Sequence, residues 1–159
     1  MTTLVHGGRV LTPAAADPTG PGVDFRTELL TSVNFRRVHA GARPLTPDGR
    51  LDAAAQRHAA DLAAHDLLQQ DGTDGSTPWH RIRAAGFAFR FAAELIAPAD
   101  SVPRAVQLWM NSPRHRDAVL DPRFDHLGTG FAPGRSGAPG RYVLTLGQSD
   151  GRPHTAVTQ

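Results

Sequence analysis

The chain contains no cysteine and no lysine, and both absences narrow the chemistry that it can perform. Without cysteine, the sequence offers no disulfide, no thiolate nucleophile and no thiolate ligand for a metal. Without lysine, all 17 basic residues are arginines, whose side chains keep their proton at any ordinary pH. Arginine, histidine and the carboxylates must therefore carry any chemistry of this chain.

Glutamate is also scarce, because Glu28 and Glu94 are the only glutamates among 15 acidic residues. The formal net charge is only +2, although the sequence pI is about 10.3. The pI is high because few groups in this sequence titrate between histidine and arginine. It therefore does not indicate a nucleic-acid partner, and we expect none.

Long apolar runs are missing as well. No stretch approaches the roughly 18 residues that a membrane span needs, so we expect no membrane span. The first residues, MTTLVHGGRVLTP, lack the basic region and the continuous apolar region of a secretory signal. As the sequence stands, we expect a cytoplasmic protein, and a secreted one if a leader is missing.

The length of 159 residues suits one domain with a single core. Residues 13–22, PAAADPTGPG, are too rich in proline and glycine for a helix or a central strand. We therefore predict an N-terminal extension over 1–22, a folded domain over 23–149 and a tail over 150–159. Within the extension, residues 3–11 are compatible with a short strand that lies along the domain.

Hydrophobic periodicity predicts an α+β fold, because helices come first and strands dominate the end of the chain. Helices are expected over about 24–41, 48–68, 76–86 and 102–111, with a helical turn after Pro113. Strands are expected over about 87–96, 125–133 and 141–148, and the last two should form a hairpin across the turn-rich GRSGAPG.

Five sequence blocks between about Leu29 and Gln148 carry a family resemblance. They are NFRRVHAGARPLTPDGRLDAAAQRHAADLA, DGTDGSTPWHRIRAAGF, AAELIA, LWMNSPRHRDAVLDPRFDHLGTGFA and RYVLTLGQ. In this order and at this spacing they resemble the bacterial CAP domains, also called SCP-like domains. The resemblance implies an α-β-α sandwich, in which helices flank a small antiparallel sheet. It also implies a cleft that gathers two histidines and one or more glutamates.

The family's cleft residues match this sequence only in part. His115 in SPRHR matches the second cleft histidine of the family's SPGHR, with Arg114 in place of glycine. Glu94 in AELIA matches the cleft glutamate of GENIA, with Leu95 in place of asparagine. Gln70 stands where the family has its first cleft histidine. The resemblance therefore implies a cleft around Glu94 and His115, to which Gln70 could also contribute.

The exchange of a histidine for Gln70 bears on metal binding, because an amide is a poor ligand for zinc. We therefore expect a metal-free cleft and no cofactor. Asp71, the next residue, could contribute a carboxylate. A rebuilt metal site that includes His80 or His126 remains an alternative.

Other histidines and the tryptophans have simpler interpretations. His58 and His65 lie seven residues apart, or about 10 Å along a helix, which is too far for one ion. We interpret both as residues at the boundary of the core. Trp79 and Trp109 occupy apolar positions of short helices and are expected in the core, with Trp109 as a wall of the cleft in a second interpretation.

The resemblance leads to a binding module as the first hypothesis. Its cleft would bind a small or lipid-like molecule or a peptide through Gln70, Asp71, Glu94, Trp109 and His115. In the alternative, an intracellular acid–base enzyme (an isomerase, cyclase or hydrolase), Glu94 and His115 are catalytic, and the carboxylate orients the imidazole and raises its pKa. A third hypothesis is a vestigial cleft, in which Glu94 forms a structural ion pair with an arginine.

Overall fold

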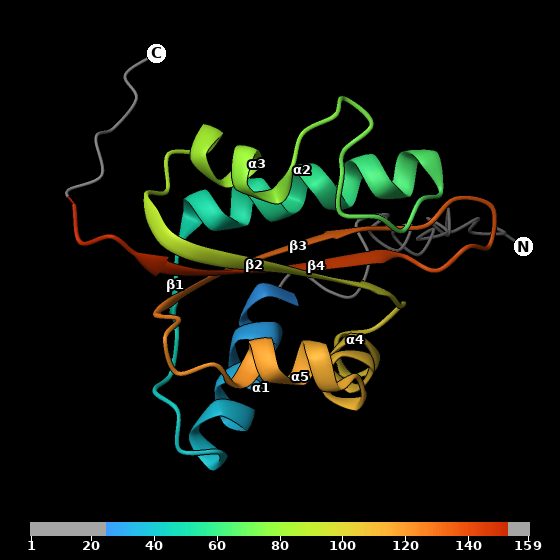
Figure 1. The fold of residues 1–159 in the computed structure, drawn as a ribbon. Coiled ribbons are helices and arrows are strands. Elements are labelled where there is room, and N and C mark those ends of the chain that lie inside the picture. Colours follow the sequence, from blue (N-terminus) through green and yellow to red (C-terminus); the bar gives the residue numbers. More distant parts are fainter. Residues whose placement is uncertain (1–24, 153–159) are drawn as a thin grey trace, which may run out of the picture.

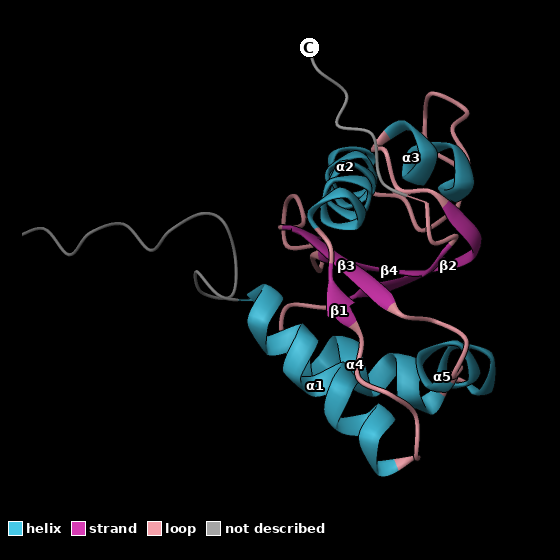
Figure 2. Cartoon of the chain, turned by 90° about the vertical axis from the view of Figure 1, so that its left-hand side faces the viewer, coloured by secondary structure: helices cyan, strands magenta, loops and turns pink. Residues whose placement is uncertain are grey.

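The structure is a computed structural model that describes residues 25–152, and these residues fold into three layers (Figures 1 and 2). The helices are α1 (Phe25–His39), α2 (Gly49–His65), α3 (Pro78–Ala84), α4 (Val102–Asn111) and α5 (Pro113–Leu120). The strands are β1 (Thr46–Pro47), β2 (Phe89–Pro98), β3 (His126–Ala132) and β4 (Arg141–Ser149). Helices α2 and α3 cover one face of the sheet, and α1, α4 and α5 cover the other. The predicted α-β-α sandwich is confirmed.

The sheet has the strand order β1-β3-β4-β2. Strand β4 pairs antiparallel with both β3 and β2, so the predicted hairpin is present. The short β1 was not predicted, and it pairs parallel to β3, which makes the sheet mixed. A two-residue strand has no periodicity to detect, and only the tertiary structure reveals it. Strand β2 lies at the opposite edge of the sheet.

Each face of the sheet has its own core. On the α1, α4 and α5 side, Trp109 and Tyr142 are among the largest buried side chains, within a cluster that also holds Leu95 and Leu127. On the α2 side, alanines dominate, together with leucine and valine: Ala55, Ala59, Leu62, Ala63 and Val143. The small side chains of α2 let this helix approach the sheet closely.

Helix α2 is defined at both ends by capping. Asp48 precedes the helix, and its carboxylate accepts hydrogen bonds from the backbone N–H groups of Arg50 and Leu51. At the other end, Asp66 adopts the left-handed conformation with φ 51°. The helix expected over 48–68 is thus slightly shorter than predicted, because the chain turns at Asp66.

Two glycines of β3 make the close contact between α2 and the sheet possible. A Cβ atom on Gly128 would overlap the backbone of Leu51, and one on Gly130 would overlap the backbone of Ala55. The helix backbone therefore lies directly against the strand. Glycine is required at these two positions by close approach, and not by an unusual φ angle.

Some sequence predictions fall outside the described residues. They concern the strand over 3–11, the linker over 13–22, and most of the tail, from 153 to 159. The division into an N-terminal extension, a domain over 23–149 and a tail stays a prediction.

The packing of α2 on β3 predicts that Gly130→Ala is destabilising. The new methyl group must push α2 away from the sheet, which should cost at least about 1–3 kcal/mol of unfolding free energy. Gly49→Ala, at the start of α2, is the matched control, because a Cβ atom there meets nothing within 4 Å. Urea denaturation measures both effects. Equal stability of the two variants would contradict the close contact.

Candidate functional site

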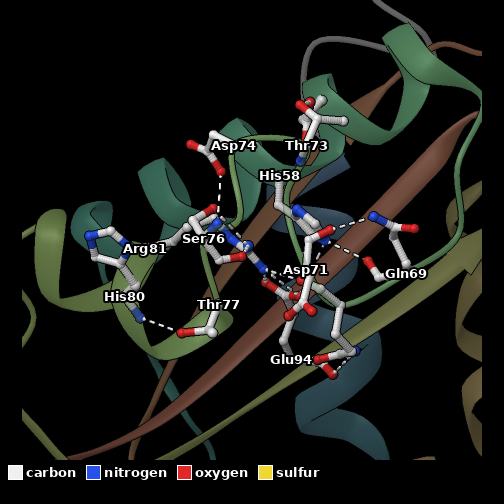
Figure 3. A network of polar contacts seen from close by, with 12 residues as sticks. His58, Gln69, Asp71, Thr73, Asp74, Ser76, Thr77, His80, Arg81 and Glu94 are labelled. Carbon is white, nitrogen blue, oxygen red and sulfur yellow. Dashed lines mark hydrogen bonds and ion pairs between the residues drawn. The ribbon is translucent and has the colours of Figure 1, made fainter.

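A buried ion pair joins α3 to β2 (Figure 3). The side chain of Glu94 points from β2 toward α2 and α3, and the side chains of Glu94 and Arg81 are each only 1% exposed. Arg81 Nη2 lies 2.9 Å from both Oε1 and Oε2 of Glu94 and donates to them. The sequence left open whether Glu94 forms a structural ion pair with an arginine. The structure shows such a pair, and the arginine is Arg81.

Arg81 also holds the loop that precedes α3. Its Nη2 donates to the carbonyl oxygen of Gln70 at 2.9 Å. Its Nη1 donates to the carbonyl oxygen of Ser76 at 2.8 Å and lies 3.2 Å from Ser76 Oγ. One guanidinium group thus connects β2, α3 and both ends of the loop over 70–76.

His58 completes the network from α2. Its Nε2 lies 2.8 Å from the carbonyl oxygen of Gln69 and 3.5 Å from Glu94 Oε1. The interpretation of His58 as a boundary residue was wrong, because it is fully buried. Its spacing was a usable signal, since Leu51 and Leu62 lie seven residues before it and four after it on the same face. His65 is half exposed, and its Nδ1 lies 3.1 Å from Asp61 Oδ1.

Burial dominates the electrostatics of this network. It raises the pKa of Glu94 to about 7, although the charge and the hydrogen bonds of Arg81 favour the ionised carboxylate. Burial and the nearby Arg81 cation both lower the pKa of His58. His58 is therefore neutral at pH 7. Because the carbonyl of Gln69 can only accept, the hydrogen of neutral His58 lies on Nε2.

A cleft of about 240 Å³ opens beside this network, between α3 and α5. Three of the five residues predicted for the site lie in it, namely Gln70, Glu94 and His115. The full lining is Gln70, Trp79, Ala93, Glu94, Leu95, Arg114, His115 and Ala118. The structure thus brings together residues that are up to 45 positions apart in the sequence, from Gln70 to His115.

The two remaining predicted residues lie elsewhere. Trp109 is 1% exposed and packs in the core on the α1, α4 and α5 side. Asp71 is exposed, and its carbonyl oxygen accepts from Gln69 Nε2 at 2.9 Å. The tryptophan of the cleft is Trp79, which is 42% exposed and not a core residue as the sequence suggested. The sequence does not reveal this, because α3 has only seven residues, too few for periodicity to distinguish its faces.

His115 lies half-buried on α5, and in residues 25–152 it forms no hydrogen bond or ion pair with Glu94. Burial lowers the pKa of His115, and the charge of Arg114 lowers it further. The expectation that Glu94 raises this pKa is therefore not met. The reason is that Arg81 and His58 occupy the Glu94 carboxylate on the other side of β2.

The histidines of the alternative metal site lie outside the cleft. His80 is exposed on α3, and the Nδ1 atom of His126 lies 2.6 Å from Asp125 Oδ1. Across residues 25–152, no three His, Asp or Glu side chains are grouped so that they could hold a metal ion. Over the same range, none of the helices combines the length and the hydropathy that crossing a membrane would demand.

The Arg81–Glu94 pair predicts a pH-dependent loss of stability in Arg81→Met. Removing one partner of a buried pair should cost about 3–5 kcal/mol of unfolding free energy. Without Arg81 the pKa of Glu94 rises further above 7, so the folded variant keeps a proton that the folded parent releases. The destabilisation should therefore grow as the pH rises through about 7.

Urea denaturation below and above pH 7 measures this effect. Arg83→Met, on the exposed side of the same helix, is the control and should change little. A loss of stability that is independent of pH would argue against a titrating Glu94.

The position of Arg114 predicts that Arg114→Ala raises the pKa of His115, because it removes one of the two causes that lower it. Glu94→Gln should leave this pKa close to the parent value, since the charge of Glu94 is paired with Arg81. NMR titration of the imidazole resonances measures both, with Arg116→Ala as the control on the same helix. A clear fall in Glu94→Gln would show a direct contact between the two residues.

Comparisons with known proteins agree with this architecture. A family model described as CAP, Cysteine-rich secretory protein family, matches residues 30–146. The uncharacterized protein YkwD of Bacillus subtilis is 27% identical over 108 residues, which cover 67% of this chain and 42% of that protein. An uncharacterized protein of Borreliella burgdorferi is 28% identical over 81 residues, covering 51% of this chain and 52% of that protein. The chain spans about half the length of these curated relatives.

Two solved structures share the fold. An outer surface protein from Borrelia burgdorferi matches with a TM-score of 0.73 and 22% identity, over 80% of this chain and 95% of that one. An extracellular protein containing a SCP domain from Bacillus anthracis matches with a TM-score of 0.71 and 21% identity, over 82% of this chain and 45% of that one. With its sequence blocks, its three layers and the family match over residues 30–146, the chain belongs to the CAP, or cysteine-rich secretory protein, family.

Proposed function

We propose that this CAP domain is a binding module whose cleft holds a ligand without converting it. The observation that carries the proposal is the burial of the Glu94 carboxylate, which is 1% exposed and bonded to Arg81. A general base must reach the proton that it abstracts, and this carboxylate does not reach the cleft surface. The cleft keeps groups that suit binding, above all the exposed Trp79.

The enzymatic alternative would need Glu94 and His115 to act as a pair. Among the described residues, no hydrogen bond or ion pair joins them, and the pKa of His115 is lowered by burial and by Arg114. Neutral His115 can still donate and accept one hydrogen bond each. This supports a role for His115 in ligand recognition.

The size and lining of the cleft support a small, amphipathic ligand. Its volume of about 240 Å³ lies below the roughly 300–1,000 Å³ of most drug-sized pockets. Trp79, Ala93 and Ala118 provide apolar surface, while Arg114 provides a cation at the same opening. The ligand that fits this lining is a small molecule, or one portion of a larger molecule such as a peptide, that combines an apolar group with an anionic one.

The relatives support a place of action outside the cytoplasm. One solved structure with this fold is described as an outer surface protein and another as an extracellular protein. We therefore place the binding function of this domain at the cell surface or outside the cell, in line with the secreted alternative of the sequence analysis.

A fragment screen by NMR tests the binding function. We expect weakly acidic, aromatic fragments to shift the backbone resonances of Ala93 and His115. Trp79→Ala should weaken their binding by about tenfold, the effect of losing one aromatic contact of about 1.4 kcal/mol. Arg116→Ala, on α5 but outside the cleft lining, is the control. Fragments that gather instead at the apolar hollow of α1, beside Leu30 and Phe35, would contradict the proposal.

A further inference from the structure

The floor of the cleft is the open edge of a β-strand. Strand β2 pairs with β4 from Phe89↔Ser149 to Pro98↔Arg141, with one register shift between Phe89 and Phe91. No strand of residues 25–152 pairs with the other side of β2, because β2 is the last strand of the sheet. Figure 2 shows this edge between α3 and α5. Such an edge carries backbone groups that can pair with another chain.

One hydrogen bond identifies the residues whose backbone groups point outward. Gln70 Nε2 donates to the carbonyl oxygen of Glu94 at 3.2 Å, so this carbonyl points away from β4. In an antiparallel strand, the N–H and C=O groups of one residue point to the same side, and the side alternates along the strand. Ala92, Glu94 and Ile96 therefore present their N–H and C=O groups to the open edge.

The exposure of Glu94 agrees with this orientation. The whole residue is 8% exposed, but its side chain is only 1% exposed. The part of Glu94 that faces the cleft is therefore its main chain. Apart from the Gln70 amide, no described group forms a hydrogen bond with the outward groups of Ala92, Glu94 and Ile96.

The walls of the cleft suit the side chains of an added strand. Along β2, the side chain of Glu94 points to the α2 and α3 layer, and that of Leu95 packs in the core of the opposite layer. A chain laid against this edge would alternate its side chains in the same way. Successive side chains would point toward Trp79 on one side and His115 on the other.

The charges around the edge favour an acidic partner. Arg114 lines the cleft. Near the start of β2, the guanidinium group of Arg83 lies 4.6 Å from the ring centre of Phe89. The carboxylate of Glu94 does not offset these cations, because Arg81 already pairs with it.

We infer that the cleft binds an extended acidic peptide, which adds as a strand to the outer edge of β2. The inference rests on the proposed binding function and names its ligand class. Main-chain hydrogen bonds to Ala92, Glu94 and Ile96 supply affinity, and the two walls of the cleft supply specificity. In the free domain, the amide of Gln70 occupies the position of one incoming N–H group and must leave when the peptide binds.

The test uses the synthetic peptide acetyl-Asp-Val-Asp-Val-Asp-amide and two N-methylated versions. One version carries N-methyl groups on the valines and the other on the second and third aspartates. Because the N–H groups of a strand point alternately to its two sides, only one methylated set faces β2. We expect one version to bind at least tenfold more weakly than the parent peptide and the other to bind about as well.

Three further experiments test whether the peptide binds at this strand edge. Amide hydrogen exchange at Ala92, Glu94 and Ile96 should slow when the parent peptide binds. Gln70→Ala should tighten binding about threefold or more, because the peptide no longer competes with a side-chain hydrogen bond. Arg114→Ala should weaken binding and reduce its dependence on salt, whereas the control Arg116→Ala should do neither.

The outcomes separate strand addition from the proposed function. If both methylated peptides bind as well as the parent peptide, strand addition is overturned and binding in the cleft stands. If the parent peptide does not bind at millimolar concentration, strand addition is also overturned, while the fragment screen still decides the binding function. Protection of the same amides by a second copy of the domain, without any peptide, would show self-association and would equally overturn the inference.

Discussion

The ion pair between Arg81 and Glu94 is the interaction on which the candidate site depends. It is almost fully buried, and a charge left alone at this depth would be costly, so neither residue is free to change independently. Through it, β2, α3 and both ends of the loop over 70–76 are held together. The Glu94 side chain lies in this pair, away from the cleft, and the main chain of the residue lies at the cleft surface.

A glutamate and a histidine in one cleft could act together as an acid–base pair, but in this structure their side chains have different surroundings. The carboxylate of Glu94 is bonded to Arg81 and so joins β2 to α3. His115 lies across the cleft without a carboxylate partner among the described residues, and its pKa is lowered and not raised. The cleft therefore combines a rigid floor with walls that come from α3 and α5. This arrangement supports the proposed binding function, since the network that fixes the floor lies beneath the cleft surface.

Sequence motifs predicted the members of the cleft better than their contacts. The AELIA and SPRHR blocks predicted a cleft around Glu94 and His115, and in the structure both residues line one cleft with Gln70. An arginine partner for Glu94 was one of the hypotheses, but Arg81 was not identified as that partner, because an arginine one turn into a short helix carries no signal of burial. The exposure of Trp79 was missed because α3 is short, and the burial of His58 because a histidine at an apolar spacing was not counted as core.

The sequence by itself determined the order of helices and strands, and its family resemblance implied the three layers. Periodicity separates helices from strands, and the glycines and alanines that let α2 lie on β3 are visible along the chain. Only the tertiary structure decided which charges pair and which backbone edge stays open. The physical reason is that periodicity reports which face of an element is buried, whereas an ion pair or a strand edge depends on where elements distant in sequence meet. Arg81 and Glu94 lie only 13 residues apart, but the fold of α3 against β2 determines that they touch.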